Sequence, residues 1–285
     1  MITVGRSPLS GTSLLAGYTP GSIEYLVLKA MLDSNGRYNF SSEEVLKFEL
    51  GLRRSIVDAA LALNKSRMGF AVFQRTYCNT DFWNRDANGG FRLKSGAIPS
   101  AAIMDIYQNG RAYATECATA MMIVYYRAML EIYGEAMFNS LFKSIYLMNW
   151  HTSDPLLRAV TTPRPVNDIL LGDRGYFANP DVDPQTPQWQ GENVIVLPNN
   201  MYYGHGVGIM PAERIIRSLN GNRKPGAART AYLMSSAGNP DYGLLYKKSL
   251  ESEPLSQPQR ASIPAARDTV RAAAARTSMP VYDGT

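Results

Sequence analysis

The sequence predicts an α+β protein in which helices come first and an antiparallel sheet follows. Apolar residues recur at steps of three and four through residues 45–63, which is the spacing of one face of a helix. Almost every residue from 117 to 133 is apolar or small, which indicates a helix buried on most sides. Beyond residue 190 the pattern changes to short strands separated by turn residues.

Two helices are predicted before the buried one. The capping-box pair Ser41 and Glu44 indicates the start of a long helix, which we expect to end at Asn64. A shorter helix is predicted over residues 100–107. We expect it to end at the Asn-Gly pair 109–110, because this pair suits the left-handed position after a helix.

The buried helix is expected to be central. Thr115 is the expected N-cap, which puts Glu116 and Cys117 at the first and second helical positions. Gly134 is expected to stop the helix, because glycine weakens a helix interior.

The second half is predicted to form the sheet. A Pro-Asn-Asn turn at residues 198–200 separates the two longest expected strands. Strands are predicted over residues 146–149, 193–197, 201–209 and 231–234, and one more helix over residues 211–219.

The composition changes after about residue 246. Residues 247–285 are rich in Ser, Pro, Gln, Ala and Arg, and four prolines interrupt any regular structure there. We therefore expect one catalytic domain over residues 1–246, followed by a mobile tail. Residues 265–276 of this tail could form a short Ala-rich helix.

Composition and charge exclude several functions. The net charge of +5 comes from Lys and Arg residues spread along the chain, so no run of them is suited to nucleic acid. With only two cysteines, Cys78 and Cys117, the chain has neither a disulfide framework nor a multi-cysteine metal site. The sequence shows no signal peptide and no apolar stretch that could span a bilayer, which predicts synthesis in the cytoplasm.

Cys117 is the candidate nucleophile. A thiol at the first turn of a buried helix lies near unpaired backbone N–H groups, which can stabilise a thiolate and form an oxyanion hole. The alternative is that Cys117 is a small buried hydrophobic residue, as free cysteines commonly are.

Glu192 and His205 are the candidate partners of this thiol. If Leu197 pairs with Met201 or Tyr202 across the turn, Glu192 falls within a residue or two of a place opposite His205. A cysteine on a central helix followed by two polar residues on consecutive strands is the arrangement of papain-like enzymes. The alternative is a bulge at the flanking glycines, with His205 as a satisfied polar residue.

Three blocks of the sequence stand out, residues 115–120 (TECATA), 188–195 (QWQGENVI) and 203–209 (YGHGVGI). They resemble motifs of the protein-glutamine gamma-glutamyltransferases of endospore-forming bacteria. The blocks occur in the same order and at similar spacing, and further similarity covers about residues 23–235.

The resemblance implies a calcium-independent transglutaminase with a papain-like core and no cofactor or metal. Its expected partners are proteins with accessible Gln and Lys side chains, spore-coat proteins among them. Deposition in the spore coat and a monomeric state are also expected. Cys117 matches the family's nucleophile, Glu192 its partner acid, Glu116 a second acid that partly substitutes, and His205 a histidine needed for activity. Trp150 and Trp189 match walls of the substrate passage, although each could be ordinary core packing.

Two departures from the family pattern stand outside the three blocks. Cys78 occupies a position where glycine is expected, and the tail extends past the usual family end. The residues Asp181, Asp183 and Glu192 have the spacing of a calcium loop, but Thr186 replaces the required glycine and two prolines stiffen the segment, so a calcium site is rejected.

The expected reaction is attack of Cys117 on a glutamine carboxamide, loss of ammonia, and transfer of the acyl group to a lysine amine. Glu192 can serve as the base only if burial raises its pKa. Two alternatives remain open. One is a papain-like thiol hydrolase or amidase, and the other is a spore-coat structural protein without catalysis.

Overall fold

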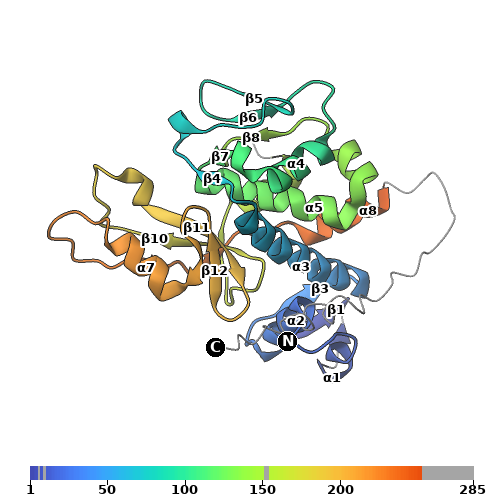
Figure 1. The fold of residues 1–285 in the computed structure, drawn as a ribbon. Coiled ribbons are helices and arrows are strands. Elements are labelled where there is room, and N and C mark those ends of the chain that lie inside the picture. Colours follow the sequence, from blue (N-terminus) through green and yellow to red (C-terminus); the bar gives the residue numbers. More distant parts are fainter. Residues whose placement is uncertain (6, 9–10, 151–153, 252–285) are drawn as a thin grey trace, which may run out of the picture. The chain divides into compact units, whose positions relative to one another are not determined.

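A computed structural model describes residues 1–5, 7–8, 11–150 and 154–251 of the 285-residue chain. Helices and strands alternate in it, with the long helices first and the largest sheet later, as the sequence predicts (Figure 1). The helices are α1 (Gly11–Leu15), α2 (Ile23–Asp33), α3 (Glu43–Ser66), α4 (Pro99–Gln108), α5 (Cys117–Leu141), α6 (Arg158–Thr161), α7 (Ala212–Asn220) and α8 (Tyr242–Glu251). The strands are β1 (Ile2–Val4), β2 (Ser7–Pro8), β3 (Tyr38–Phe40), β4 (Gly69–Phe70), β5 (Trp83–Arg85), β6 (Phe91–Leu93), β7 (Ala114–Thr115), β8 (Tyr146–Leu147), β9 (Arg164–Pro165), β10 (Arg174–Ala178), β11 (Gly191–Leu197), β12 (Met201–Gly204), β13 (Gly208–Pro211), β14 (Tyr232–Leu233) and β15 (Ser236–Ala237).

The main core forms where α3, α4 and α5 pack together (Figure 1). The apolar stripe of α3 is buried along its length, from Leu52 and Ile56 to Leu63, and it meets the almost wholly buried residues of α5. A second, smaller core joins α2 and the start of α3 to β1 and β3. Of the extra N-terminal helices, α2 packs on α3 and α1 packs on α2.

The largest sheet has five antiparallel strands in the order β13-β12-β11-β10-β14. Successive side chains of β11 point to opposite faces of it. Ile195 and Leu197 join the main core, whereas Val194 packs with α7 on the other side. This alternation directs Asn193 toward the start of α5, whereas Glu192 lines a neighbouring cavity.

The hairpin register agrees with the prediction. Leu197 pairs with Met201, and the turn residues Asn199 and Asn200 have φ of 60° and 55°, as a tight hairpin turn requires. Continuing the pairs from Val194 and Gly204 by one residue puts His205 opposite Asn193, next to Glu192. The predicted strand over residues 201–209 is wrong in one respect, because residues 205–207 form a second turn that separates β12 from β13.

The ends of the first long helix differ from the prediction. Ser42, not Ser41, is the N-cap of α3, and its hydroxyl accepts a hydrogen bond from the backbone N–H of Val45. The helix runs past Asn64 to Ser66 and ends where Arg67 takes the left-handed conformation, at φ 62°.

The cap of the central helix also differs. Thr115 belongs to β7, which pairs with β4, so its backbone is held in a strand. The N-cap is Glu116, whose carboxylate accepts hydrogen bonds from the N–H groups of Ala118 (2.5 Å) and Thr119 (2.7 Å). Cys117 is therefore the first helical residue. Gly134 interrupts α5 with φ 73°, which confirms the predicted stop, although helical residues continue to Leu141.

The remaining elements agree with the predictions apart from their ends. The predicted left-handed position at residues 109–110 is wrong, because Asn109 has φ −117° and its side chain donates to the Asp105 carboxylate. A short 3-10 helix, Gly110–Ala112, follows there. The predicted strand over residues 146–149 ends at Leu147, before Asn149 takes φ 48°.

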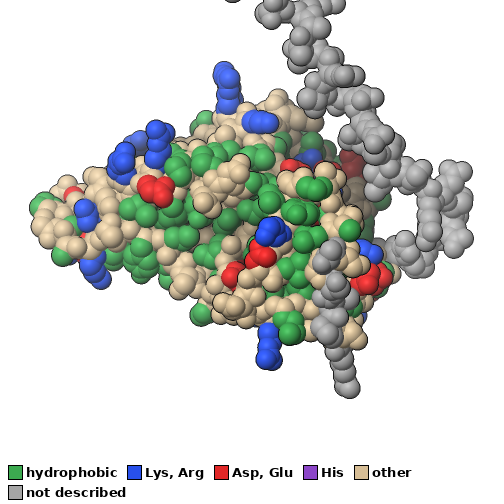
Figure 2. Space-filling model, turned by 90° about the horizontal axis from the view of Figure 1, so that it is seen from below, with side chains coloured by type: hydrophobic (Ala, Val, Ile, Leu, Met, Phe, Trp, Pro, Cys, Tyr) green, Lys and Arg blue, Asp and Glu red, His purple; other side chains and the backbone are tan. Residues whose placement is uncertain are grey.

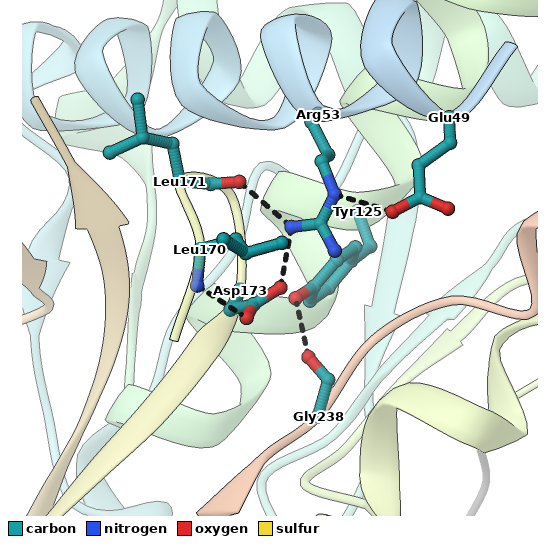
Figure 3. Close-up of polar contacts among 7 residues, drawn as sticks. All are labelled: Glu49, Arg53, Tyr125, Leu170, Leu171, Asp173 and Gly238. Atoms are coloured by element: carbon teal, nitrogen blue, oxygen red, sulfur yellow. Dashed lines mark hydrogen bonds and ion pairs between the residues drawn. The ribbon is translucent and has the colours of Figure 1, made fainter. Parts of the chain in front are cut away.

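A buried ionic cluster ties α3 to the segment before β10 (Figure 3). Arg53, which is 3% exposed, donates to Glu49 at 2.8 Å and to Asp173 at 2.6 Å. It also donates to the carbonyl oxygen of Leu171, and the N–H of Leu170 donates to the second Asp173 oxygen. Attraction from these carboxylates holds the pKa of Arg53 above its usual range even though burial opposes the charge.

The surface carries charged groups of both signs. On the face in Figure 2, Lys and Arg side chains occur at several places, with Asp and Glu side chains among them. Among the described residues, no helix combines the length and apolarity needed to cross a bilayer. Helix α8 continues through residue 246 to Glu251, and the predicted tail helix over residues 265–276 lies outside the described residues.

Candidate functional site

Cys117 lies on the wall of a cavity of about 750 Å³. Cys117 lies there because β7 directly precedes α5 in the chain, and α5 packs against β11 near Asn193. The Nδ2 atom of Asn193 donates a hydrogen bond to Cys117 Sγ at 3.5 Å. Glu116, Trp150, Arg174 and Tyr176 line the same cavity.

The thiol is neutral at physiological pH. Burial, together with the negative charges of Glu192 and Glu116, raises the pKa of Cys117 to about 12, and the Asn193 hydrogen bond opposes this rise. The expected stabilisation of a thiolate by the helix N-terminus is therefore outweighed. A neutral thiol attacks a carboxamide only if its proton leaves to a base.

Glu116 explains why the N-terminus of α5 provides little stabilisation to a thiolate at Cys117. Its carboxylate binds the N–H groups of Ala118 and Thr119 and accepts from the Thr119 hydroxyl. These two N–H groups of the first turn are therefore occupied and do not contribute to the expected oxyanion hole. The Thr119 hydroxyl oxygen in turn accepts from the N–H of Asn149 at 2.8 Å, which anchors the loop that carries Trp150.

Glu192 is a buried carboxyl that lines a second cavity, of about 160 Å³. This cavity shares Phe70, Val72 and Gln188 with the first one. Burial and the charge of Glu116 raise the pKa of Glu192 well above its usual range. Its Oε1 atom is buried and accepts no hydrogen bond from the described residues. These conditions give a carboxylate the higher proton affinity that a base for a thiol needs.

Gly204 makes room for the Glu192 side chain. A Cβ atom at this position would lie 2.8 Å from Glu192 Oε1 and 2.6 Å from the Val207 side chain. We therefore expect Gly204→Ala to displace the carboxyl and lower kcat by about tenfold or more, since small misplacements of reacting groups are costly. Gly221→Ala is the control, because the nearest atom to its added Cβ is 3.4 Å away. Equal kcat values for both variants would contradict this role of Gly204.

His205 is held between two partners. Its Nε2 lies 3.0 Å from the carbonyl oxygen of Gly69 and its Nδ1 lies 3.2 Å from the Tyr203 hydroxyl. It lines the smaller cavity with Glu192, so the two residues meet as expected, but the ring nitrogens contact Gly69 and Tyr203 instead of the acid. Burial lowers the pKa of His205 to about 4. At neutral pH the ring is therefore uncharged, with Nε2–H donating to Gly69.

This low pKa predicts that acid destabilises the fold. The unfolded chain binds a proton at His205 near pH 6.5 and the folded chain only near pH 4, so stability falls as pH falls through this window. The loss attributable to His205 is about 3 kcal/mol at most. Urea unfolding at pH 7 and pH 4.5 should show a smaller decrease for His205→Gln than for the native chain. Equal decreases would contradict a neutral buried histidine.

The two candidate tryptophans lie in different cavities. Trp150 lines the larger cavity, and the guanidinium of Arg174 lies over its ring. The distance from Arg174 Cζ to the centroid of the Trp150 ring is 4.6 Å. Trp189 lines the smaller one and also packs against the core around α7. Both tryptophans are thus cavity walls and packing residues at once.

Sequence reasoning missed three residues of the site. Asn193 follows Glu192 directly, and its place on the opposite face of β11 could have been read from the strand alternation. Arg174 donates to Asn193 from β10, but it lies 19 residues earlier in the chain and has no motif of its own. Phe70 lines both cavities and is 45% exposed.

None of the clusters of His, Cys, Asp and Glu in the described residues has the three members that a metal ion requires. The rejected calcium spacing is explained by Asp181, which binds Arg229 at 2.6 Å and accepts from two backbone N–H groups. Glu192 lies in the middle of the sheet, paired with Phe177.

Comparison with known proteins gives a consistent result. Residues 1–249 match the family of protein-glutamine gamma-glutamyltransferases. A relative of that name from Halalkalibacterium halodurans is 44% identical over 214 residues, which are 75% of this chain and 74% of the relative. The Bacillus mycoides relative is 44% identical over 82% of this chain and 83% of its own. A Bacillus cereus relative is 39% identical over 98% of this chain and 99% of its own.

A solved structure is also similar to this one. It is a transglutaminase from Geobacillus stearothermophilus without its C-terminal extension. The two chains are 45% identical and superpose with a TM-score of 0.68, over 72% of this chain and 97% of the other. The similarity therefore includes both the sequence and the mixed helix and sheet architecture.

Proposed function

The chain belongs to the protein-glutamine gamma-glutamyltransferase family and is a transglutaminase, and from this premise we propose that Cys117 is its nucleophile. The observation that carries the proposal is the position of a half-buried, neutral thiol at the edge of a cavity, under the electrostatic influence of a carboxyl with a raised pKa. A thiol and an acid with these properties suit acyl transfer through a covalent intermediate.

The proposed reaction has two steps. Cys117 Sγ attacks the carboxamide carbon of a substrate glutamine as Glu192 takes the thiol proton, and this proton then passes to the leaving nitrogen, which departs as ammonia. The thioester that remains is attacked by a lysine amine. The C–S bond breaks, the isopeptide bond forms, and the proton lost by the amine returns through Glu192 to the thiol. The raised pKa of Glu192 supports its role in both directions.

The other candidate residues have supporting roles in this proposal. Glu116 keeps negative charge beside the thiol and caps α5, so it is a weaker substitute for Glu192. His205 joins the turn after β12 to β4, next to Phe70, through its bond to Gly69. Trp150 and Trp189 exclude water, which would otherwise hydrolyse the thioester.

The finer assignments are also proposals. We propose a papain-like arrangement, because the nucleophile begins a central helix that packs on an antiparallel sheet. We propose that catalysis needs no calcium, since the proposed steps use only side chains of the chain. We also propose spore-coat proteins as substrates and the spore coat as the place of action, because the sequence blocks resemble those of endospore-forming bacteria. We further propose that the enzyme acts as a monomer.

The test is incorporation of a fluorescent primary amine into a glutamine-bearing protein, with and without a calcium chelator. We expect labelling that resists the chelator, is lost in Cys117→Ala and persists in the matched variant Cys78→Ala. Labelling that persists in Cys117→Ala would overturn the nucleophile, and labelling that the chelator removes would overturn calcium independence.

The coat assignment has its own test. Spores made with the Cys117→Ala variant as the only source of this enzyme should contain fewer isopeptide cross-links in their coat fraction than spores made with the native chain. Equal numbers of cross-links would contradict a role in the coat while leaving the enzymatic proposal in place.

A further inference from the structure

Arg174 is a buried cation beside the proposed nucleophile. Its side chain is 3% exposed and lines the same cavity as Cys117. Its Nε donates to the carbonyl oxygen of Val160 at 3.1 Å and its Nη1 donates to Asn193 Oδ1 at 2.9 Å. Its Nη2 has no acceptor among the described residues, and none of the carboxylates there forms an ion pair with it.

This arrangement differs from that of the other buried arginine. Arg53 is neutralised by two carboxylates, Glu49 and Asp173. Arg174 keeps a positive charge in a buried site without an anionic partner, which is costly and therefore calls for a function. Its ring contact with Trp150 offsets only part of the cost.

The contact with Arg174 fixes the orientation of the Asn193 amide. A guanidinium only donates hydrogen bonds, so it must face the amide oxygen of Asn193. The amide nitrogen then points the other way, to Cys117 Sγ, 3.5 Å distant. Without Arg174 the amide could turn over and present its oxygen to the sulfur, which would repel a thiolate.

The rest of the site needs such a donor. Glu116 occupies the N–H groups of Ala118 and Thr119, so these do not serve a developing negative charge. The charged or titratable groups around the thiol are Glu116 on its own side, Glu192 from β11, and Arg174 and Tyr176 from β10. The two acids oppose a thiolate, and Arg174 is the cation among these groups.

We propose that Asn193 is a catalytic residue that donates its N–H to Cys117 Sγ as negative charge develops there, and that Arg174 is the positioning residue that orients this amide and offsets the two acids. This inference rests on the proposed nucleophile. It assigns to β10 and β11 the electrostatic role that the N-terminus of α5 cannot fill.

The experiment is the pH dependence of Cys117 alkylation by iodoacetamide, followed by mass spectrometry of the cysteine peptides. Only the thiolate reacts, so the profile reports the balance of charges at the sulfur. The native chain is compared with Asn193→Ala, Arg174→Gln and Arg174→Lys. Cys78 in the same samples is the internal control, because its pKa of about 11 is set by its own burial and by Arg85 and Lys94.

We expect the Cys117 alkylation profile to move to higher pH in Asn193→Ala and further in Arg174→Gln. At a fixed pH below the pKa, each unit by which the pKa rises lowers the alkylation rate by about tenfold. Arg174→Lys should recover part of the loss, because it restores the charge without the fork-shaped geometry. The Cys78 profile should not move. In amine incorporation, kcat should fall about tenfold or more while KM for the glutamine substrate changes little.

A purely structural role for these residues predicts lower thermal stability with an unchanged Cys117 profile. Such a result in folded Asn193→Ala would overturn the inference even if the Arg174 variants fail to fold. Full amine incorporation in Cys117→Ala would instead overturn the nucleophile and this inference together. The two failures are therefore distinguishable.

Discussion

Replacing Glu192 by glutamine is expected to abolish most amine incorporation, by about 10²- to 10⁴-fold in kcat, and at the same time to stabilise the protein at neutral pH. The catalytic loss follows because an amide cannot take the thiol proton. The stability gain follows because burial raises the pKa of Glu192, so ionising this carboxyl costs the folded chain more free energy than it costs the unfolded chain.

The sign of this stability change depends on pH. Because the pKa of Glu192 is raised in the folded chain, native stability falls as pH rises above about 4.5, and the glutamine variant lacks this loss. The difference between the two chains should therefore shrink as pH is lowered toward 4.5. Thermal unfolding at pH 4.5 and pH 8 measures it.

Two matched variants make the test specific. Glu213→Gln changes an exposed carboxyl on α7 and should alter neither activity nor stability. Glu116→Gln should weaken activity less than Glu192→Gln, because its main contacts cap α5. Full activity in both Glu192→Gln and Glu116→Gln would remove the carboxylates from the mechanism.

Replacing Arg53 by methionine is expected to lower the free energy of unfolding by about 3–5 kcal/mol. The substitution leaves Glu49 and Asp173 buried without their cation, in the cluster of Figure 3. The cluster joins α3 to the segment that leads into β10, so its loss also loosens the strand that carries Arg174.

Arg54 provides the control for this prediction. It is the next residue of α3, and its side chain is 49% exposed in an ion pair with Glu24. Because exposed pairs contribute little, Arg54→Met should change the free energy of unfolding by less than about 1 kcal/mol. Urea unfolding measures the free energy of unfolding of both variants. Similar decreases for Arg53→Met and Arg54→Met would contradict a stabilising role that is specific to the buried cluster.

Local patterns predicted the parts of the fold that depend on neighbouring residues. The turn at residues 198–200 limited the hairpin to two registers, and the structure has the one in which Leu197 pairs with Met201. The break in α5 followed from Gly134, and the buried character of that helix followed from its composition.

The predictions that were wrong concern features that depend on tertiary contacts. Thr115 is a good N-cap by residue type, but pairing of β7 with β4 holds it in a strand and leaves the cap to Glu116. With that one-residue shift, the Glu116 carboxylate occupies the N–H groups of Ala118 and Thr119. The contact between Arg174 and Asn193 joins two strands, so no local signal in the sequence could reveal it.

The central claim is that Cys117 carries the acyl group during transfer, and trapping that intermediate tests it most directly. The enzyme is mixed with a glutamine-bearing peptide in the absence of an amine, and the reaction is quenched in acid. After digestion, the masses of the Cys117 and Cys78 peptides are measured by mass spectrometry. We expect a mass increase on the Cys117 peptide equal to the mass of the substrate less ammonia, together with released ammonia and an unmodified Cys78 peptide. Ammonia release with the acyl group on any other residue would contradict it.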